Sequence, residues 1–372
     1  MIMFFADAHL EHRLYHEYTD NFLTTSEVDS RIALDGVYKR ASQSDIELII
    51  FGGDYFHVSK PSTENIRWMQ EWFKNMDSLD KPFYVIPGNH DVSSHSHSLV
   101  SLHSLGLKNI FLLEHTVSKI TWNDWNIYFL PFLCPKSSKN KYASTLHELN
   151  SVFKHLNPLE RNLVISHVQE RESKLGSESG FIARAVDIID LDNEVEYENT
   201  TFLMGHIHRA QAYKKRNGIN VIYPGSLSYL EHTDCGQRKG YVLISKNGDI
   251  DFESIPGIRV YKRYMISEDK NIFDFFDSIR MSNNDVVFID VESEESLLET
   301  EVREYLKGRG CSLGKIRYAV KGDDNIVVPE ILSVNPLLSL EEFLSLYFKD
   351  NPTFDWRNKI LSLGKEFLSN AD

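Results

Sequence analysis

Five short apolar runs in this chain each end in a cluster of histidine, aspartate or asparagine, and this pattern constrains the fold more than any other feature. The runs are MIMFFADAH, IELIIFGGDYFH, FYVIPGNHD, NLVISHV and TFLMGHIH. Such near-continuous apolar runs are typical of strands buried on both faces. Helical patterns at 28–43 and 64–76 separate the early runs, which favours an α/β core. In such sheets ligands bind beyond the carboxyl ends of the strands, so we expect a binding site where the clusters meet.

The clusters contain a candidate metal-binding set of two carboxylates, one amide oxygen and four imidazoles. The candidate ligands are Asp7, His9, Asp54, Asn89, His167, His206 and His208. Nitrogen and oxygen donors without a thiolate suit Mn²⁺, Fe²⁺ or Zn²⁺. Seven ligands exceed what one ion needs once water is counted, so the set predicts two ions that share a bridging carboxylate. Paired ions ~3.5–4 Å apart are a common device for displacement at phosphorus.

The chain has fifteen histidines, and six of them lie in the five clusters. We interpret the others, including His12 and the HSHS stretch at 95–98, as surface residues or as hydrogen-bonded parts of loops and helices. The HSHS stretch has no carboxylate at a useful spacing in the sequence, so it predicts no metal site.

Length and charge narrow the class of protein. A chain of 372 residues is long enough for two or three domains. The net charge of −14 counts against binding to nucleic acid through a general positive field. It does not exclude a nuclease whose positive charge is concentrated at metal ions, or whose partner holds the DNA.

The sequence also predicts a cellular compartment. Cys134, Cys235 and Cys311 are isolated and form no metal-type spacing, which indicates a reducing environment. The first apolar run has no basic region before it and ends at Asp7, so we expect no signal peptide. No apolar stretch approaches the ~20 residues of a membrane span. We therefore predict a cytoplasmic protein without membrane association, in a bacterium or, if a phage encodes it, in the host cell.

The polar clusters also resemble known motifs. DAH, GGDYFH, GNHD, SHV and GHIH, in this order, resemble the five signature blocks of the calcineurin-like metallophosphoesterases. GGDYFHVSKPS and YPGSLSYLE are similar, more narrowly, to the SbcD-type nucleases, the DNA-cutting subunits that pair with SbcC-type ATPases. The motifs cover roughly residues 1–231. This chain departs from the family at Glu11, where glycine is usual. The resemblance therefore does not predict the backbone conformation of the turn in the first loop.

The resemblance implies an α/β fold, a metallophosphoesterase β-sandwich flanked by helices in the layer order α/β/β/α. It also implies two Mn²⁺ ions as cofactors, with Mg²⁺, Fe²⁺ or Zn²⁺ as alternatives. By resemblance, the first ion would be bound by Asp7, His9, Asp54 and His208. The second would be bound by Asp54, Asn89, His167 and His206, so Asp54 would bridge the two ions.

Three further residues have catalytic roles by resemblance. His90 would contact the scissile phosphate and help the leaving oxygen depart, as an acid or hydrogen-bond donor. Asp91 would orient His90, and it could also cap a helix that begins near Val92. His57 would lie beside the phosphate and position the DNA strand, although a packing role is the alternative. Protein phosphatases of the superfamily typically have arginine at this position, so His57 favours the nuclease branch.

Basic residues near the motifs are candidates for contacts with a phosphate backbone. The DNA-binding candidates are Arg13, Lys60 and Arg209. Arg209 follows His208 directly, so we expect it at the rim of the site. Charge runs are more often solvated surfaces than binding sites, and we interpret the basic loop at 136–141 in that way.

The pattern of elements changes near 256–257, which predicts three segments. Residues 1–256 would form the nuclease domain. Residues 257–328, with three strand patterns and two helix patterns, would form a small α+β capping domain that helps to grip DNA. Residues 329–372 contain two amphipathic helical patterns. By resemblance these C-terminal helices would bind the coiled coil of an SbcC-type ATPase, and packing on the cap is the alternative.

Two apolar stripes follow the KPS and GNHD motifs. The first contains Ile66, Met69, Trp72 and Phe73, and the second contains Leu99, Val100, Leu102 and Leu105. In the resembled family these helices form a homodimer. Ordinary packing on the sheet is the alternative that the sequence leaves open.

These observations predict a Mn²⁺-dependent DNA nuclease subunit, with exonuclease or single-strand endonuclease activity, that acts in DNA repair and recombination. The alternative is a dimetal phosphodiesterase that hydrolyses a small molecule with the same ions and a different pocket. The capping and C-terminal segments favour the nuclease, because a small-molecule enzyme has no evident use for them.

Overall fold

The computed structural model describes residues 1–12, 23–93, 97–114, 116–132, 145–176, 188–192, 194–267, 271–291 and 299–318. The chain divides into two compact units, Met1–Asp324 and Asn325–Asp372. Every described residue belongs to the first unit, so Arg13 and the predicted C-terminal helices at 329–372 lie outside the described residues.

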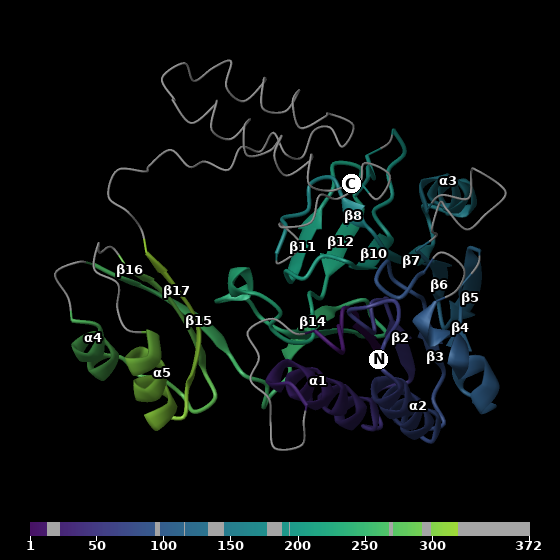
Figure 1. Cartoon of the computed structure of the whole chain (residues 1–372). Coiled ribbons are helices and arrows are strands. Elements are labelled where there is room, and N and C mark those ends of the chain that lie inside the picture. Colours follow the sequence, from purple (N-terminus) through teal and green to yellow (C-terminus); the bar gives the residue numbers. More distant parts are fainter. Residues whose placement is uncertain are drawn as a thin grey trace, which may run out of the picture. The chain divides into compact units, whose positions relative to one another are not determined.

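Two six-stranded sheets with mixed strand directions contain most of the described strands (Figure 1). The first sheet has the order β14 (Ile250–Ser254), β13 (Gly240–Ile244), β1 (Ile2–Phe5), β2 (Leu48–Phe51), β3 (Phe83–Val85) and β4 (Ile110–Leu112). The second has the order β11 (Gln211–Lys214), β12 (Asn220–Tyr223), β10 (Thr200–Gly205), β7 (Arg161–His167), β6 (Trp125–Leu130) and β5 (Ser118–Trp122). The central strands of each sheet are parallel, and antiparallel pairs occur toward the edges.

Alternate residues of the central strands face different layers, as the two-residue period of a strand requires. On β1, Met3 and Phe5 pack with helix residues, whereas Ile2 and Phe4 pack with residues of the second sheet. On β10, Phe202 packs with the helix that covers the second sheet. The covering helices are α1 (Thr25–Ala41) and α2 (Thr63–Asp77) on the first sheet and α3 (Thr145–His155) on the second (Figure 1). The predicted α/β fold with two packed sheets is confirmed.

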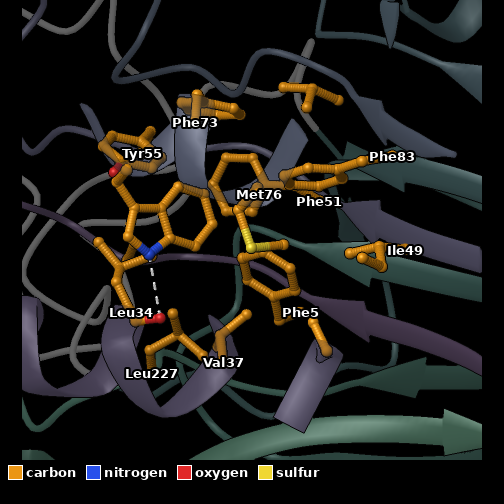
Figure 2. Close-up of a cluster of buried hydrophobic side chains, with 14 of the residues drawn as sticks. Phe5, Leu34, Val37, Ile49, Phe51, Tyr55, Phe73, Met76, Phe83 and Leu227 are labelled. Atoms are coloured by element: carbon orange, nitrogen blue, oxygen red, sulfur yellow. Dashed lines mark hydrogen bonds between the residues drawn. The ribbon is translucent and has the colours of Figure 1, made fainter. Parts of the chain in front are cut away.

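Aromatic side chains dominate the core between the first sheet and its helices (Figure 2). Phe73 of α2 stacks on Phe83 of β3, with ring centroids 5.6 Å apart and an interplanar angle of 15°. Trp72 is 3% exposed, and its Nε1 donates a hydrogen bond of 3.1 Å to the carbonyl oxygen of Leu34 in α1. This bond holds α1 and α2 together beneath the strands that lead to the metal-ligand motifs.

Replacing Trp72 by phenylalanine should lower the free energy of unfolding by about 1–2 kcal/mol. The change removes the hydrogen bond to Leu34 and leaves space where the indole packed. Denaturant unfolding measures the loss. Trp68→Phe in the same helix is the control, because Trp68 is only partly buried at the margin of this core, and it should change stability by less than about 0.5 kcal/mol. Equal losses of stability in the two variants would contradict the role of Trp72 in joining α1 and α2.

The stripe at 99–105 forms a 3₁₀ helix, η1 (Ser98–Leu105), in place of a regular α-helix. With three residues per turn, positions 99 and 102 lie on one face, and Leu99 and Leu102 are buried. Val100 is 47% exposed, so its predicted place in the same apolar face is wrong. The buried side chains of α2 and η1 pack on their own sheet, and the homodimer stays a prediction.

A separate three-stranded parallel sheet follows the two large sheets in the chain (Figure 1). It consists of β15 (Tyr261–Ile266), β16 (Val286–Val291) and β17 (Ser312–Tyr318), with α4 (Ile272–Ser278) and α5 (Glu299–Gly308) packed against it. These elements match the strand and helix patterns of the sequence, while their status as a capping domain stays a prediction.

The smallest described elements complete the fold. Strand β8 (Gln169–Glu170) pairs with β9 (Ile188–Ile189), and a 3₁₀ turn, η4 (His232–Asp234), precedes β13. No helix within the described ranges is long and apolar enough to cross a membrane.

Candidate metal centre

The candidate ligands follow strands of both sheets at the edge where the parallel strands end. Asp7 and His9 follow β1, Asp54 follows β2, Asn89 follows β3, His167 ends β7, and His206 and His208 follow β10. Because β1 and β2 are neighbours in one sheet and β7 and β10 are neighbours in the other, the two layers contribute ligands from opposite sides.

One group of donor atoms gathers around His9. Its Nε2 lies 2.8 Å from Nε2 of His208, 3.8 Å from Oδ1 of Asp7 and 3.6 Å from Oδ2 of Asp54. Donor atoms of Asp7, His9 and His208 all lie within 4.8 Å of one another. Atoms at this spacing can share one divalent ion bound at about 2 Å from each.

A second group gathers around His167. Its Nε2 lies 3.2 Å from Oδ2 of Asp54 and 3.0 Å from Oδ1 of Asn89. The Nδ1 of His206 lies 2.8 Å from the same Asn89 oxygen. Oδ2 of Asp54 therefore lies close to a histidine of each group, which is the place a bridging carboxylate would occupy.

The electrostatics of the cluster suit cation binding. Burial lowers the pKa values of His9 and His208 well below the ordinary value. Burial, and then the neighbouring His167, lowers the pKa of His206 to about 3. These rings are neutral at physiological pH, which is the form that binds metal.

His167 differs from the other candidate histidines. Burial opposes its charge, but the adjacent Asp54 raises its pKa to about 9. In return, although burial opposes it, His167 lowers the pKa of Asp54. A cation at Nε2 would take the place of this proton. The cluster thus consists of buried oxygen and neutral nitrogen donors, and the proton on His167 offsets part of the negative charge of the aspartates. Such a donor set fits a pair of divalent cations.

The backbone is strained at four of the seven candidate ligands. Positive φ angles occur at Asp7 (54°), His9 (44°), Asp54 (58°) and His206 (88°). A non-glycine residue in this region costs of order 1–3 kcal/mol and persists where the surroundings impose it. Hydrogen bonds from the backbone N–H of His206 to both oxygens of Asp7, at 3.0 and 3.1 Å, are part of that surrounding structure.

Two half-buried histidines lie beside the ligand groups. His90 and His57 stack with centroids 5.0 Å apart and an interplanar angle of 25°. Nδ1 of His90 lies 2.7 Å from the carbonyl oxygen of His57, and Nδ1 of His57 lies 3.3 Å from Nδ1 of His9. Burial, and then His90, lowers the pKa of His57 to about 4. The pair therefore lies on the more open side of the cluster, in contact with it.

Asp91 is fully buried and connects the loops after β2 and β3. Its carboxylate accepts hydrogen bonds from the backbone N–H groups of Gly88 at 3.0 Å, Asp54 at 2.9 Å, Tyr55 at 3.1 Å and Phe56 at 3.3 Å. Nδ1 of the His90 ring donates its hydrogen bond to the His57 carbonyl, not to Asp91. Asp91 thus fixes the loops that hold Asp54 and His90, a role that its position in GNHD did not indicate.

Two neighbours of the first motif were not predicted as parts of the site. Glu11 has φ of 73°, so it adopts the turn for which the family uses glycine. Its carboxylate accepts a 2.9 Å hydrogen bond from the backbone N–H of Ser62, the residue that caps α2. His12 is 2% exposed and packs edge-on against His57, with centroids 4.6 Å apart. Its interpretation as an ordinary loop histidine missed this contact, and only its closeness to His9 in the sequence hinted at it.

The DNA-binding candidates that the structure describes are on the surface. Lys60 and Arg209 are both exposed, and Arg209 lines a cavity of about 400 Å³ together with Arg238 and Phe252. Arg13 lies outside the described residues.

Comparisons with known proteins bear on the family to which the chain belongs. A family model described as calcineurin-like phosphoesterase matches residues 1–311. The chain is 24% identical over 286 residues to the DNA double-strand break repair protein Mre11 of Archaeoglobus fulgidus. That match covers 69% of this chain and 59% of the Archaeoglobus protein, so this chain spans less than two thirds of its length.

Two solved structures match the chain at low sequence identity and low TM-score. A dimetal phosphatase from Danio rerio is 12% identical with a TM-score of 0.37, and the match covers 60% of this chain and 86% of that one. GAP50, the anchor in the inner membrane complex of Plasmodium, is 13% identical with a TM-score of 0.37, over 70% of this chain and 85% of that one. The family model spans most of the chain and every candidate ligand, and we conclude that the chain is a hydrolase of the calcineurin-like phosphoesterase family, with a candidate dimetal site.

Proposed function

We propose that this chain hydrolyses phosphodiester bonds of DNA with two Mn²⁺ ions, as the nuclease subunit of a repair complex with an SbcC-type ATPase. The observation that supports it most directly is the stacked pair of His90 and His57 beside the metal-ligand groups. The similarity to a protein named for DNA double-strand break repair supports the same substrate.

In this proposal the two ions have separate ligand sets joined by Asp54. Asp7, His9, Asp54 and His208 would hold the first ion, and Asp54, Asn89, His167 and His206 would hold the second. Two bound divalent ions would supply Lewis acidity for the phosphoryl oxygens and for the attacking water. Mn²⁺, Fe²⁺ and Zn²⁺ suit this mixed nitrogen and oxygen donor set, and the resemblance to SbcD-type nucleases favours Mn²⁺.

His90 is proposed to act on the leaving oxygen. A carbonyl oxygen only accepts hydrogen bonds, so Nδ1 of His90 bears the hydrogen that meets the carbonyl of His57. Nε2 is therefore the ring nitrogen of His90 that is left to act on the substrate. Water forms a bond to phosphorus and releases a proton to solvent, while the bond to the leaving sugar oxygen breaks. His90 in its doubly protonated form donates the Nε2 proton to that oxygen.

His57 and the basic residues are proposed to hold the DNA strand. His57 is neutral because its pKa is about 4, so it can donate one hydrogen bond to a phosphate without adding charge. Lys60 and Arg209 are exposed on the surface.

A further basic group lies on the three-stranded sheet. Arg263, Lys315 and Arg317 lie close enough to His232 that, after burial, their charges lower its pKa, and Arg317 contacts its ring. Asp290 pairs with Arg263, and the group of three cations stays positive in sum. Such a local positive group suits a phosphate backbone despite the negative net charge of the chain. It supports the proposal that residues 257–328 form a capping domain that contacts DNA.

The assembly is also a proposal. Binding to an SbcC-type ATPase would use the segment at 329–372, and a homodimer would place two sites on one DNA. Both come from the resemblance to SbcD-type nucleases, with residues 1–256 as the nuclease domain.

The proposal predicts that His90→Asn lowers Mn²⁺-dependent cleavage of linear duplex or single-stranded DNA by about 10²–10⁴-fold. The number of bound Mn²⁺ ions should stay at the wild-type value, because His90 is not among the proposed ligands. His103→Asn is the matched control, since His103 is 53% exposed and pairs with Glu114, and it should cleave DNA like the wild type.

The outcomes separate the candidate functions. DNA cleavage that survives His90→Asn would remove His90 from the mechanism. Hydrolysis of bis-p-nitrophenyl phosphate without DNA cleavage, even after an SbcC-type ATPase is added, would favour the small-molecule alternative. A wild-type chain that binds no Mn²⁺ would refute the ligand assignment.

A further inference from the structure

A buried lysine lies directly behind the proposed metal site. Lys239 immediately precedes β13 and is 3% exposed. Its Nζ donates hydrogen bonds of 3.0 Å to the carbonyl oxygen of His208 and 2.7 Å to Oγ of Ser226. It also lies 3.2 Å from Oδ2 of Asp234, whose side chain is fully buried. The sequence motifs gave no reason to single out this residue.

The three oxygens offset the charge of the buried ammonium group and accept two hydrogen bonds from it. A lysine ammonium has three N–H donors and no acceptor, and a buried charge is costly unless it is paired and hydrogen-bonded. Here a carbonyl and a hydroxyl accept hydrogen bonds from Lys239, and the Asp234 carboxylate pairs with its charge at 3.2 Å. A buried charge that is satisfied in this way defines one geometry, because any shift of an acceptor leaves a donor unpaired.

The acceptors of Lys239 belong to the segment that supports two metal ligands. The carbonyl of His208 accepts a second hydrogen bond, of 3.1 Å, from the backbone N–H of Ser226. The next residue, Leu227, donates its backbone N–H to the carbonyl of Asp7 at 3.2 Å. The segment at Ser226 and Leu227 thus connects the loop of His208 to the loop of Asp7, and Lys239 fixes one end of that connection.

Lys239 also joins the two large sheets. Strand β13 pairs with β1 in the first sheet, and β1 leads to Asp7. His208 follows β10 in the second sheet. The hydrogen bond from Nζ of Lys239 to His208 therefore crosses from one sheet to the other at the edge where the candidate ligands gather.

We propose that Lys239 is a positioning residue that sets the place of His208 relative to Asp7, and through it the affinity of the first metal ion. The inference rests on the proposed dimetal centre, and it adds a residue that touches neither ion. Lys239 bonds directly to the carbonyl of His208, a proposed ligand of the first ion. It reaches the second ion only through His206, which follows the same strand and bonds to Asp7, so the larger effect should fall on the first ion.

The experiment measures Mn²⁺ binding to the full chain by equilibrium dialysis and by the electron paramagnetic resonance signal of the spin-coupled Mn²⁺ pair. In Lys239→Met, one binding step should weaken by about 10–100-fold, and the other by a clearly smaller factor. At Mn²⁺ concentrations that load both sites in the wild type, the variant should show the signal of single, uncoupled Mn²⁺.

Lys81→Met is the matched control. Lys81 also donates to main-chain carbonyl oxygens, those of Ala41 and Gln43, both at 2.6 Å, but at the C-terminal end of α1. The Lys81→Met variant should bind both ions like the wild type. Equal weakening in the two lysine variants would show a general effect of lost stability and would overturn the proposal.

Two further variants keep the test decisive if Lys239→Met fails to fold. Lys239→Met combined with Asp234→Asn removes both buried charges, and Ser226→Ala removes only one acceptor. Each should weaken the same binding step, Ser226→Ala by the smaller factor. Folded variants that bind both ions with unchanged affinity would overturn the role of Lys239 while leaving the centre intact. A wild-type chain that binds no Mn²⁺ would instead refute the proposed centre itself.

Discussion

Asp54→Asn should abolish the paired metal centre and reduce phosphodiester hydrolysis to the level seen without metal. Oδ2 of Asp54 lies 3.6 Å from Nε2 of His9 and 3.2 Å from Nε2 of His167, so its carboxylate is placed to join both ligand groups. An amide has a neutral oxygen and cannot offset the charge of two cations. Loss of both ions removes the Lewis acidity on which the proposed reaction depends.

Thermal unfolding with and without Mn²⁺ provides a measurement independent of activity. A ligand present at 100 times its dissociation constant stabilises the folded state by about 2.7 kcal/mol, so Mn²⁺ should raise the melting temperature of the wild type and leave Asp54→Asn unchanged.

Asp29→Asn is the matched control for this prediction. Asp29 is also a buried aspartate, but it pairs with Arg259 at 2.7 Å, away from the ligands. That variant should lose some stability and keep the response to Mn²⁺. An Asp54→Asn variant that still gains stability from Mn²⁺ would contradict the bridging assignment.

Gly205→Ala should lower the free energy of unfolding by about 2–4 kcal/mol and weaken metal binding at the same time. A Cβ atom at this position would lie 2.5 Å from the carbonyl oxygen of Gly52 and 2.7 Å from Nδ1 of His167. Those two atoms form the 2.7 Å hydrogen bond that orients the His167 ring. The added methyl group would push them apart, and with them a candidate ligand.

The measurements are denaturant unfolding and the number of bound Mn²⁺ ions per chain. Gly308→Ala is the control: a Cβ atom there meets no atom within 4 Å, and the residue ends helix α5. Alanine at that position should be neutral or slightly stabilising. If Gly205→Ala were as stable as the wild type, the close packing of β10 against the loop after β2 would be wrong.

The parts of the fold that depend on repeated patterns were predictable from the sequence. The apolar runs that became β1, β2, β3, β7 and β10 end in the polar clusters, and parallel strands bring their ends together. The helix expected at 64–76 is α2, because its apolar spacing matches a helical period. Pattern also indicated the strands and helices of the three-stranded sheet.

The parts that depend on single long-range contacts were not predictable. Asp91 accepts hydrogen bonds from backbone groups more than thirty positions away, such as that of Asp54. Lys239, beside a strand of the first sheet, donates a hydrogen bond to His208, which follows a strand of the second. Neither contact leaves a periodic trace in the sequence. Glu11 was visible only as a departure from a family pattern, and its side chain compensates by bonding to Ser62. The helical period predicted for 99–105 failed because that segment closes with three residues per turn.

The positive φ angles at Asp7, His9, Asp54 and His206 have a consequence for engineering this protein. Each of these backbone conformations would be relaxed by glycine, so a screen that rewards heat resistance alone would favour replacing the very residues proposed to bind metal. Stability and function compete at these positions, as they do at many active sites. Variants should therefore be selected with Mn²⁺ present. Bound metal stabilises the folded chain only when the ligand side chains are there, so glycine at these positions would no longer be selected.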